Sequence, residues 1–311
     1  MKKLIFASAL LAAAMTSCND DVETVSQDAN TLLQVNASIE GNTSRVSTEV
    51  GWNTNKTSFV QGDAIGLFVY QNVWGNTYNG VSANVKGTKV SDAPWKLEPA
   101  VNMTKDMAQI WAYYPYDISS TDGKAIPVDL TKDYMWGTNG TPSVSTAHPE
   151  VSITMNHALT QFALRLQYSP EYKNFGKLTK IELKSDAAVF AQEGLMNVTN
   201  GSITGKTPSL NITYPGLTAE FPKTDTTKDY VAMLFPMTAP TVGGVTMFLT
   251  IDGVVWKHKF AAHEWKAGNK NVYTLKLKSD AIVIGGKDGS DIKIEPWTES
   301  TNGAVELTPA N

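Results

Sequence analysis

The sequence is short of the residues that usually carry enzymatic chemistry. Its 311 residues include one cysteine, Cys18, and four histidines. A single cysteine excludes a disulfide within the chain and a cysteine-pair metal site. His148, His157, His258 and His263 lack metal-ligand spacing, and no nucleophile elbow, phosphate-binding loop or dinucleotide-binding fingerprint occurs. The sequence therefore predicts neither an enzyme nor a cofactor, although a carboxylate pair for glycoside cleavage stays open.

Arginine is also scarce, and long apolar runs are missing after the first residues. Arg45 and Arg165 are the two arginines, and the net charge is −4 with 18% charged residues. No basic stripe exists to neutralise phosphates, which argues against a nucleic-acid partner. Beyond residue 17 no stretch approaches the roughly 18 apolar residues of a membrane-spanning helix. With 42% hydrophobic residues, the composition is that of a globular protein.

Residues that favour strands and turns are abundant. The chain holds 34 threonines, 29 aromatic residues and 23 glycines. Leu33, Val35, Ala37 and Ile39 alternate with polar residues, which predicts a strand with one apolar face. Further expected strands are Ala64–Tyr70, Ala108–Tyr114, Val151–Gln167, Leu178–Leu183, Tyr230–Phe235, Val245–Ile251, Val254–Phe260 and Val272–Leu277. The sequence therefore predicts an all-β protein.

The expected domain organisation follows from length and turn signals. At about 150 residues per domain, 311 residues predict two domains. Turn-prone residues at Ser169–Asn174 place the boundary near residue 170, between domains over 31–170 and 171–311, each a mostly antiparallel β-sandwich. Asp252–Gly253 predicts a tight hairpin, and a short helix is conceivable within Lys180–Gln192.

The N-terminus is expected to be a sorting signal. Two lysines precede the apolar run Leu4–Met15, which predicts a signal peptide over residues 1–17. Cys18 follows small residues and resembles a bacterial lipobox cysteine, so we expect its lipidation, with an ordinary secretory signal as the alternative. Residues 18–30 would be a tether. The acidic segment Asn19–Glu23 resembles the surface-export signal of Bacteroidetes lipoproteins, unless it is a plain linker.

Two kinds of side chain invite a functional interpretation. His157 begins an apolar segment and is expected to be a structural histidine joining strand ends rather than a proton or ligand site. Eight tryptophans offer sugar-stacking surfaces. Four of them lie in polar, loop-like contexts: Trp52, Trp74, Trp95 and Trp136. Four others lie in or beside strands and are expected in the core: Trp111, Trp256, Trp265 and Trp297.

Five segments in order resemble those of the fimbrillin family, the type V pilin proteins of Bacteroidetes. They are Gln61–Phe68 (QGDAIGLF), Ala112–Tyr116 (AYYPY), Met155–Leu159 (MNHAL), Trp265–Leu275 (WKAGNKNVYTL) and Ile292–Trp297 (IKIEPW). Each segment alone is a weak signal. Together, behind a lipobox, they identify the chain as a member of this family.

The resemblance implies a fold and a maturation route. Family members have two transthyretin-like β-sandwich domains in tandem and are exported as lipidated precursors. In shaft pilins a trypsin-like, arginine-specific protease removes the first strand, and a strand from another subunit fills the groove. Carried over, cleavage falls between Arg45 and Val46. The displaced strand bears Leu33, Val35, Ala37 and Ile39, and the donor tail bears Val305 and Leu307.

The resemblance therefore implies a fimbrial subunit or accessory fimbrillin at the outer membrane, with its mature form in the fimbrium. Its partners would be other fimbrial subunits, the lipoprotein-processing enzymes, the maturation protease, outer-membrane lipid and a host or bacterial surface ligand. The alternatives are a monomeric glycan-binding surface lipoprotein and a hydrolase. Shaft, tip and anchor roles stay open, as does a tail that remains packed on its own domain.

Overall fold

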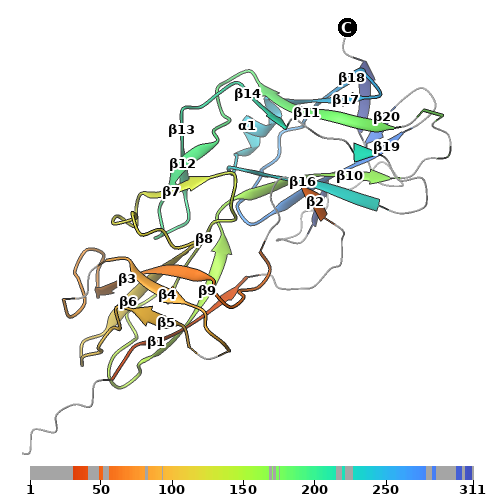
Figure 1. The fold of residues 1–311 in the computed structure, drawn as a ribbon. Helices are drawn as coiled ribbons and strands as arrows, with labels where there is room; N and C mark the ends of the chain where they lie inside the picture. Colours follow the sequence, from red (N-terminus) through yellow and green to blue (C-terminus); the bar gives the residue numbers. More distant parts are fainter. Residues whose placement is uncertain are drawn as a thin grey trace, which may run out of the picture. The chain divides into compact units, whose positions relative to one another are not determined.

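The computed structural model is nearly all β (Figure 1). It describes residues 31–40, 49–51, 56–80, 83–92, 94–167, 170, 173–174, 176–214, 219–220, 227–277, 282–284, 299–302 and 305–309. Among these residues one short helix is present, α1 (Ala239–Gly243). No helix in the described part is long and apolar enough to span a membrane.

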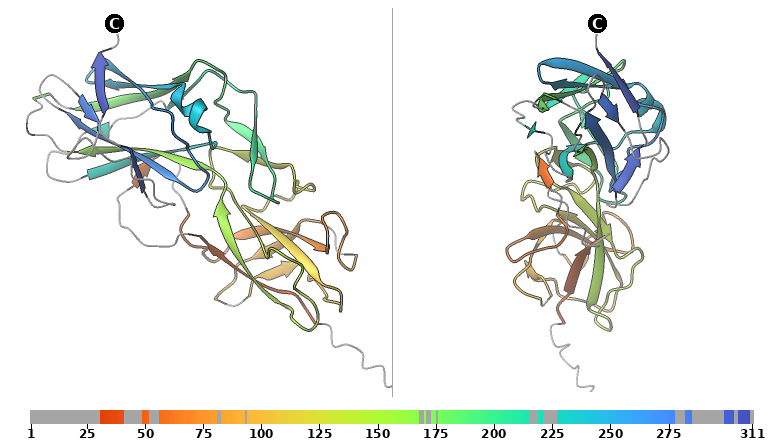
Figure 2. Two further views of the ribbon diagram at one scale, coloured as in Figure 1. Left: turned by 180° about the vertical axis from the view of Figure 1, so that it is seen from behind. Right: turned by 90° about the vertical axis from the view of Figure 1, so that its right-hand side faces the viewer.

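The first half of the chain forms a seven-stranded sheet in the order β1-β9-β8-β6-β3-β4-β5. These strands are β1 (Gln34–Ile39), β3 (Ala64–Gln71), β4 (Val85–Thr88), β5 (Lys96–Glu98), β6 (Ala108–Tyr114), β8 (Met135–Thr138) and β9 (Glu150–His157). All neighbours are antiparallel except β1 and β9, which run parallel. Because β1 is the first strand in this order, it lies at one edge of the sheet, next to β9 (Figure 2).

This sheet curls around one apolar cluster. Side chains from both of its edges meet there, including Val35 of β1 and Trp95, which directly precedes β5. The Trp95 backbone N–H donates to the Val35 carbonyl over 2.8 Å. Because the last strands of the sheet thus reach back to the first, β1 closes an incomplete barrel rather than standing at an open edge.

Strands of the second half of the chain, joined by β2 from the first half, build two facing layers. The first contains β10 (Thr160–Gln167), β16 (Thr227–Leu234), β19 (Lys270–Leu277), β20 (Ile282–Ile284), β21 (Glu299–Asn302) and β2 (Glu49–Gly51). The second contains β11 (Lys177–Ser185), β14 (Asn211–Tyr214), β15 (Ala219–Glu220), β17 (Val245–Ile251), β18 (Val254–Lys259) and β22 (Val305–Pro309). Apolar side chains of both layers form one core, and β22 pairs with both β18 and β20, so it joins the layers.

A third apolar cluster connects the two halves. A small sheet of β7 (Ile126–Asp129), β12 (Glu193–Met196) and β13 (Ile203–Lys206) covers the outer face of β3 and β6. Phe68 and Tyr113 face this cluster, whereas Leu67 and Ala112 face the first one. Because β3 is buried on both faces, it reads as a continuous apolar run rather than an alternating one.

Several expectations of the strands are confirmed. The predicted strand Val245–Ile251 is β17, and the Asp252–Gly253 hairpin joins it to β18. Both turn residues have positive φ, 47° and 80°, as a two-residue hairpin of this type requires. The segment Val151–Gln167 divides into β9 and β10, which belong to different sheets, with the change between His157 and Thr160.

The short helix expected within Lys180–Gln192 is wrong. Residues up to Ser185 continue β11, and none of residues 186–192 is helical. The register of β11 against β17 shifts between Leu178 and Lys180.

Candidate functional site

The feature of the fold most directly suited to strand exchange is the groove that holds β1, between β9 on one side and residues 95–103 on the other, which we call the seat of β1. On one side β1 pairs with β9 from Gln34↔Glu150 to Ile39↔Met155. On the other side Leu33 N–H donates to the Val101 carbonyl over 2.9 Å, and Met103 N–H donates to the Thr31 carbonyl over 2.8 Å. With the bond from Trp95 N–H to the Val35 carbonyl, backbone hydrogen bonds therefore hold β1 and the residues directly before it on both edges.

The apolar face of β1 is buried as the alternation predicts. Leu33 is 5% exposed, Val35 0% and Ile39 7%, and Ala37 packs against the same cluster. Burying three such side chains contributes roughly 5–9 kcal/mol, at about 1.5–3 kcal/mol each. Removing β1 would open an apolar trough. It would also leave the Trp95 N–H and the backbone groups of β9 that pair with β1 without partners.

The predicted cleavage point lies between two strands of different sheets. β1 ends at Ile39 in the first sheet, and β2 begins at Glu49, parallel to β16 in the second half of the chain. Arg45 and Val46 belong to the connection and lie outside the described residues, as do Cys18, Trp52 and Trp297. A cut in this connection would separate β1 covalently from the rest of the chain.

Arg165, the other arginine, is held within the fold. Its Nε and Nη2 atoms donate to the two carboxylate oxygens of Asp229 over 2.7 and 2.8 Å, and Lys270 Nζ donates to the same carboxylate over 3.0 Å. The Arg165 side chain is 17% exposed. Arg165 is therefore shielded within the fold, and its partner Asp229, distant in sequence, gave no local signal.

The predicted donor tail is paired within its own chain. Pro309 and Thr308 of β22 face Trp256 and Lys257 of β18. Leu307 and Val305 of β22 face residues of β20. The side chains of Val305 and Leu307 are not among those described. To act as a donor, β22 would have to leave both β18 and β20.

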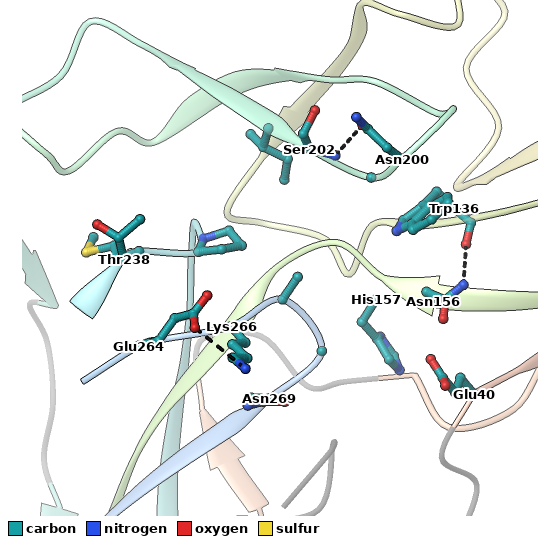
Figure 3. A pocket seen from close by; sticks show the side chains of 16 residues that line it. Glu40, Trp136, Asn156, His157, Asn200, Ser202, Thr238, Glu264, Lys266 and Asn269 are labelled. Atoms are coloured by element: carbon teal, nitrogen blue, oxygen red, sulfur yellow. Dashed lines mark hydrogen bonds and ion pairs between the residues drawn. The ribbon is translucent and has the colours of Figure 1, made fainter. Parts of the chain in front are cut away.

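A pocket of about 720 Å³ lies beside the start of β10 (Figure 3). His157 is at its wall, and its Nδ1 atom lies 2.9 Å from Oδ1 of Asp133, with both side chains buried. His157 is therefore a buried structural residue that links the end of β9 to Asp133. Among the described residues no cluster of three His, Cys, Asp or Glu side chains suits a metal ion.

The six tryptophans that the structure describes do not form an exposed platform. Trp95 lies outside the strands, directly before β5, as its loop-like context predicts, but it is 3% exposed in the first core and offers no stacking surface. Trp111 and Trp265 are buried as expected, and Trp256 is partly buried against the same core as Trp265. Trp74 and Trp136 are half-buried. Of these, Trp136 lines the pocket.

Gly201 tests the placement of Trp136. Gly201 has φ +71°, and a Cβ there would overlap Nε1 and Cδ1 of Trp136, whereas Gly253 has φ +80° and open space around it. We expect Gly253→Ala to cost about 1–2 kcal/mol from strain alone. Gly201→Ala should cost about 1–3 kcal/mol more, because the indole must move. Urea unfolding of both variants measures the difference, and equal losses would contradict the contact.

The architecture defines a class: an all-β protein with a first strand hydrogen-bonded on both sides, three large apolar clusters and no metal cluster among the described residues. A family profile described as fimbrillin-like matches residues 44–297. The chain belongs to the fimbrillin-like family. Comparison with curated proteins finds no match.

Solved structures share this fold at low sequence identity. A candidate cell adhesion protein from Bacteroides ovatus superposes with a TM-score of 0.62 and 16% identity, covering 86% of this chain and 98% of its own. A second candidate cell adhesion protein, from Bacteroides uniformis, gives 0.58 and 16%, with 86% and 99% covered. A fimbrial protein from Bacteroides vulgatus gives 0.52 and 16%, with 86% and 99% covered. These similarities support the fold.

Proposed function

We propose that this protein is a cell-surface fimbrial or adhesion subunit that assembles by exchange of its first strand. The observation that carries the proposal is the seat of β1, an apolar strand bonded along both edges and joined to the rest of the chain by the connection that bears Arg45. Family membership and the fimbrial and adhesion proteins of the same fold support a structural rather than an enzymatic role.

The proposed route begins with export as a lipoprotein acylated at Cys18, processed by the lipoprotein enzymes and held by outer-membrane lipid. A trypsin-like protease then cuts between Arg45 and Val46. The organisation as two tandem sandwiches over 31–170 and 171–311 belongs to the same proposal. A host or bacterial surface ligand would be met by the mature form in the fimbrium.

Strand exchange supplies a physical drive for assembly. Loss of β1 exposes an apolar trough and unpaired backbone groups of β9. A strand from a second subunit restores both by β-augmentation. Because the contact joins a tail to a different surface, it does not close on itself and propagates as a filament. The C-terminal segment with Val305 and Leu307 is the proposed donor.

A cut alone should not release β1. The fragment would remain held by the hydrogen bonds on both edges and by the buried faces of Leu33, Val35 and Ile39. An incoming donor strand would have to displace it. This makes assembly depend on a second chain as well as on the protease.

Limited digestion tests the route. We expect an arginine-specific protease to cut soluble protein of residues 19–311 before Val46, and the cut protein to form SDS-resistant ladders, since Arg165 is shielded by Asp229. Arg45→Ala should abolish both. Arg45→Lys is the matched control, because it keeps the charge, resists the arginine-specific enzyme and remains open to trypsin. Ladders from Arg45→Ala, or none from the cut wild type, would contradict the proposal.

A further inference from the structure

The pocket beside His157 combines an aromatic surface with several polar groups. Figure 3 shows Trp136 and Asn156 on one side and Asn200 and Ser202 above them, with Glu264 and Lys266 opposite. Its volume of about 720 Å³ falls within the range of small-molecule sites, ~300–1,000 Å³. The pocket adjoins the end of the seat of β1, because Glu40, directly after β1, and Asn156 and His157 at the end of β9 line it.

Several of these polar groups have unused hydrogen-bonding capacity. Asn200 Oδ1 accepts from Ser202 N–H over 3.0 Å. Both side chains are exposed, and the Nδ2 group of Asn200 and the hydroxyl of Ser202 bond to no described residue, so they are open to solvent or to a ligand. Asn156 Nδ2 makes two long contacts of 3.5 Å, to the Trp136 and Thr154 carbonyls. Asn156 Oδ1 has no partner among the described residues. Donors and acceptors on both sides therefore face the same space.

The charges and polar groups that line the pocket restrict the class of ligand that fits it. Lys266 Nζ lies 3.6 Å from Glu264 Oε2, and Glu40 adds a second carboxylate, so the lining has no excess positive charge for a phosphate or a sulfate. No three metal-ligating side chains gather among the described residues. The lining carries more amide and hydroxyl groups than the few that a site for an apolar ligand contains. A neutral ligand with many hydroxyl groups fits this set.

The position of Trp136 supports the same chemistry. Trp136 lies on β8 opposite Asn156 of β9, and Gly201 packs against its five-membered ring. The pairing of β8 with β9 and the contact with Gly201 thus fix the half-buried indole of Trp136 beside the amide groups of Asn156 and Asn200. A rigid aromatic ring with polar groups around it binds ligands that have an apolar face and hydroxyl edges.

We propose that this pocket binds a neutral oligosaccharide, with Trp136 stacking on a sugar ring and Asn156, Asn200 and Ser202 bonding its hydroxyls. The inference rests on the adhesion role proposed above, for which it names a ligand. It does not depend on strand exchange, because the site is present in the uncut chain. A failure of ladder formation and a failure of sugar binding are thus separate results.

Isothermal titration of soluble protein of residues 19–311 tests the site. The probes are cellotetraose, mannotetraose, laminaritetraose and N-acetyllactosamine, with a heparin octasaccharide as the anionic comparator. We expect at least one neutral probe to bind with a Kd below about 1 mM. Asn156→Ala and Asn200→Ala should each weaken it about threefold to tenfold, and Trp136→Ala should abolish it.

Controls separate binding from folding. Asn156→Ala removes only two long contacts, so its unfolding midpoint should match the wild type even if Trp136→Ala is destabilised. Asn102→Ala, far from the pocket lining, should bind as wild type. Binding unchanged in Asn156→Ala and Asn200→Ala, binding of heparin alone, or no binding of any neutral probe would each overturn the proposal.

Discussion

Val35→Asp will lower the free energy of unfolding by roughly 4–5 kcal/mol and the Tm by about 8–20 °C. Val35 is 0% exposed in the first core, and its carbonyl accepts the Trp95 N–H that closes the barrel. A carboxylate at this place cannot be buried without a cationic partner. The strand should therefore leave its seat, while the rest of the chain keeps its second core.

The second consequence of this change concerns assembly. If strand exchange operates, Val35→Asp should form ladders without any protease, because the trough is open. Asn36→Asp is the matched control, since Asn36 is the next residue of β1 and is exposed. It should keep the wild-type Tm and need the protease. Equal destabilisation by both changes would refute the seating of β1, and a destabilised Val35→Asp without ladders would refute the exchange.

Asp229→Asn is expected to cost about 3–5 kcal/mol, with a fall in Tm of about 6–20 °C. Asp229 is 2% exposed and lies between Arg165 and Lys270, and Lys270 is itself buried at 4%. Removing the negative charge leaves the two cations close together without the carboxylate between them. Glu98→Gln is the control. Glu98 lies 2.6 Å from Lys96, a shorter distance, but both side chains are exposed, so water and salt screen the pair and no measurable change follows.

The same carboxylate should make stability depend on pH. Burial raises the pKa of Asp229, but the hydrogen bond from Arg165 and the charge of Lys270 outweigh it and hold the pKa below its ordinary value. The folded state therefore binds fewer protons than the unfolded state near pH 4. The contribution is complete above the unfolded pKa of about 3.9 and is lost as the pH falls through the folded value. The free energies of unfolding of the wild type and Asp229→Asn, measured in urea, should converge as the pH falls through the folded pKa. A difference that stays constant with pH would contradict the assignment.

The strand pattern was readable because it is local. The alternation of Leu33, Val35 and Ile39 matches the buried face of β1. The dipeptide Asp252–Gly253 forms the predicted hairpin between β17 and β18. Where local signals misled, a tertiary feature was the cause. Trp95 lies in a polar stretch of sequence, but the curling of the sheet places it in the core. The candidate pocket could not be read, because its residues come from segments spread between Glu40 and Asn269.

The sequence by itself determined the all-β class, the buried face of β1 and the tight hairpin between β17 and β18. These depend on period-two patterning and on residues that adopt positive φ, and both act over a few positions. Only the tertiary structure decided which distant groups meet: Trp95 with Val35, His157 with Asp133, and Arg165 with Asp229. Alternation fixes the side of a sheet on which a residue lies but not its partner, because pairing depends on how the sheets curl and stack.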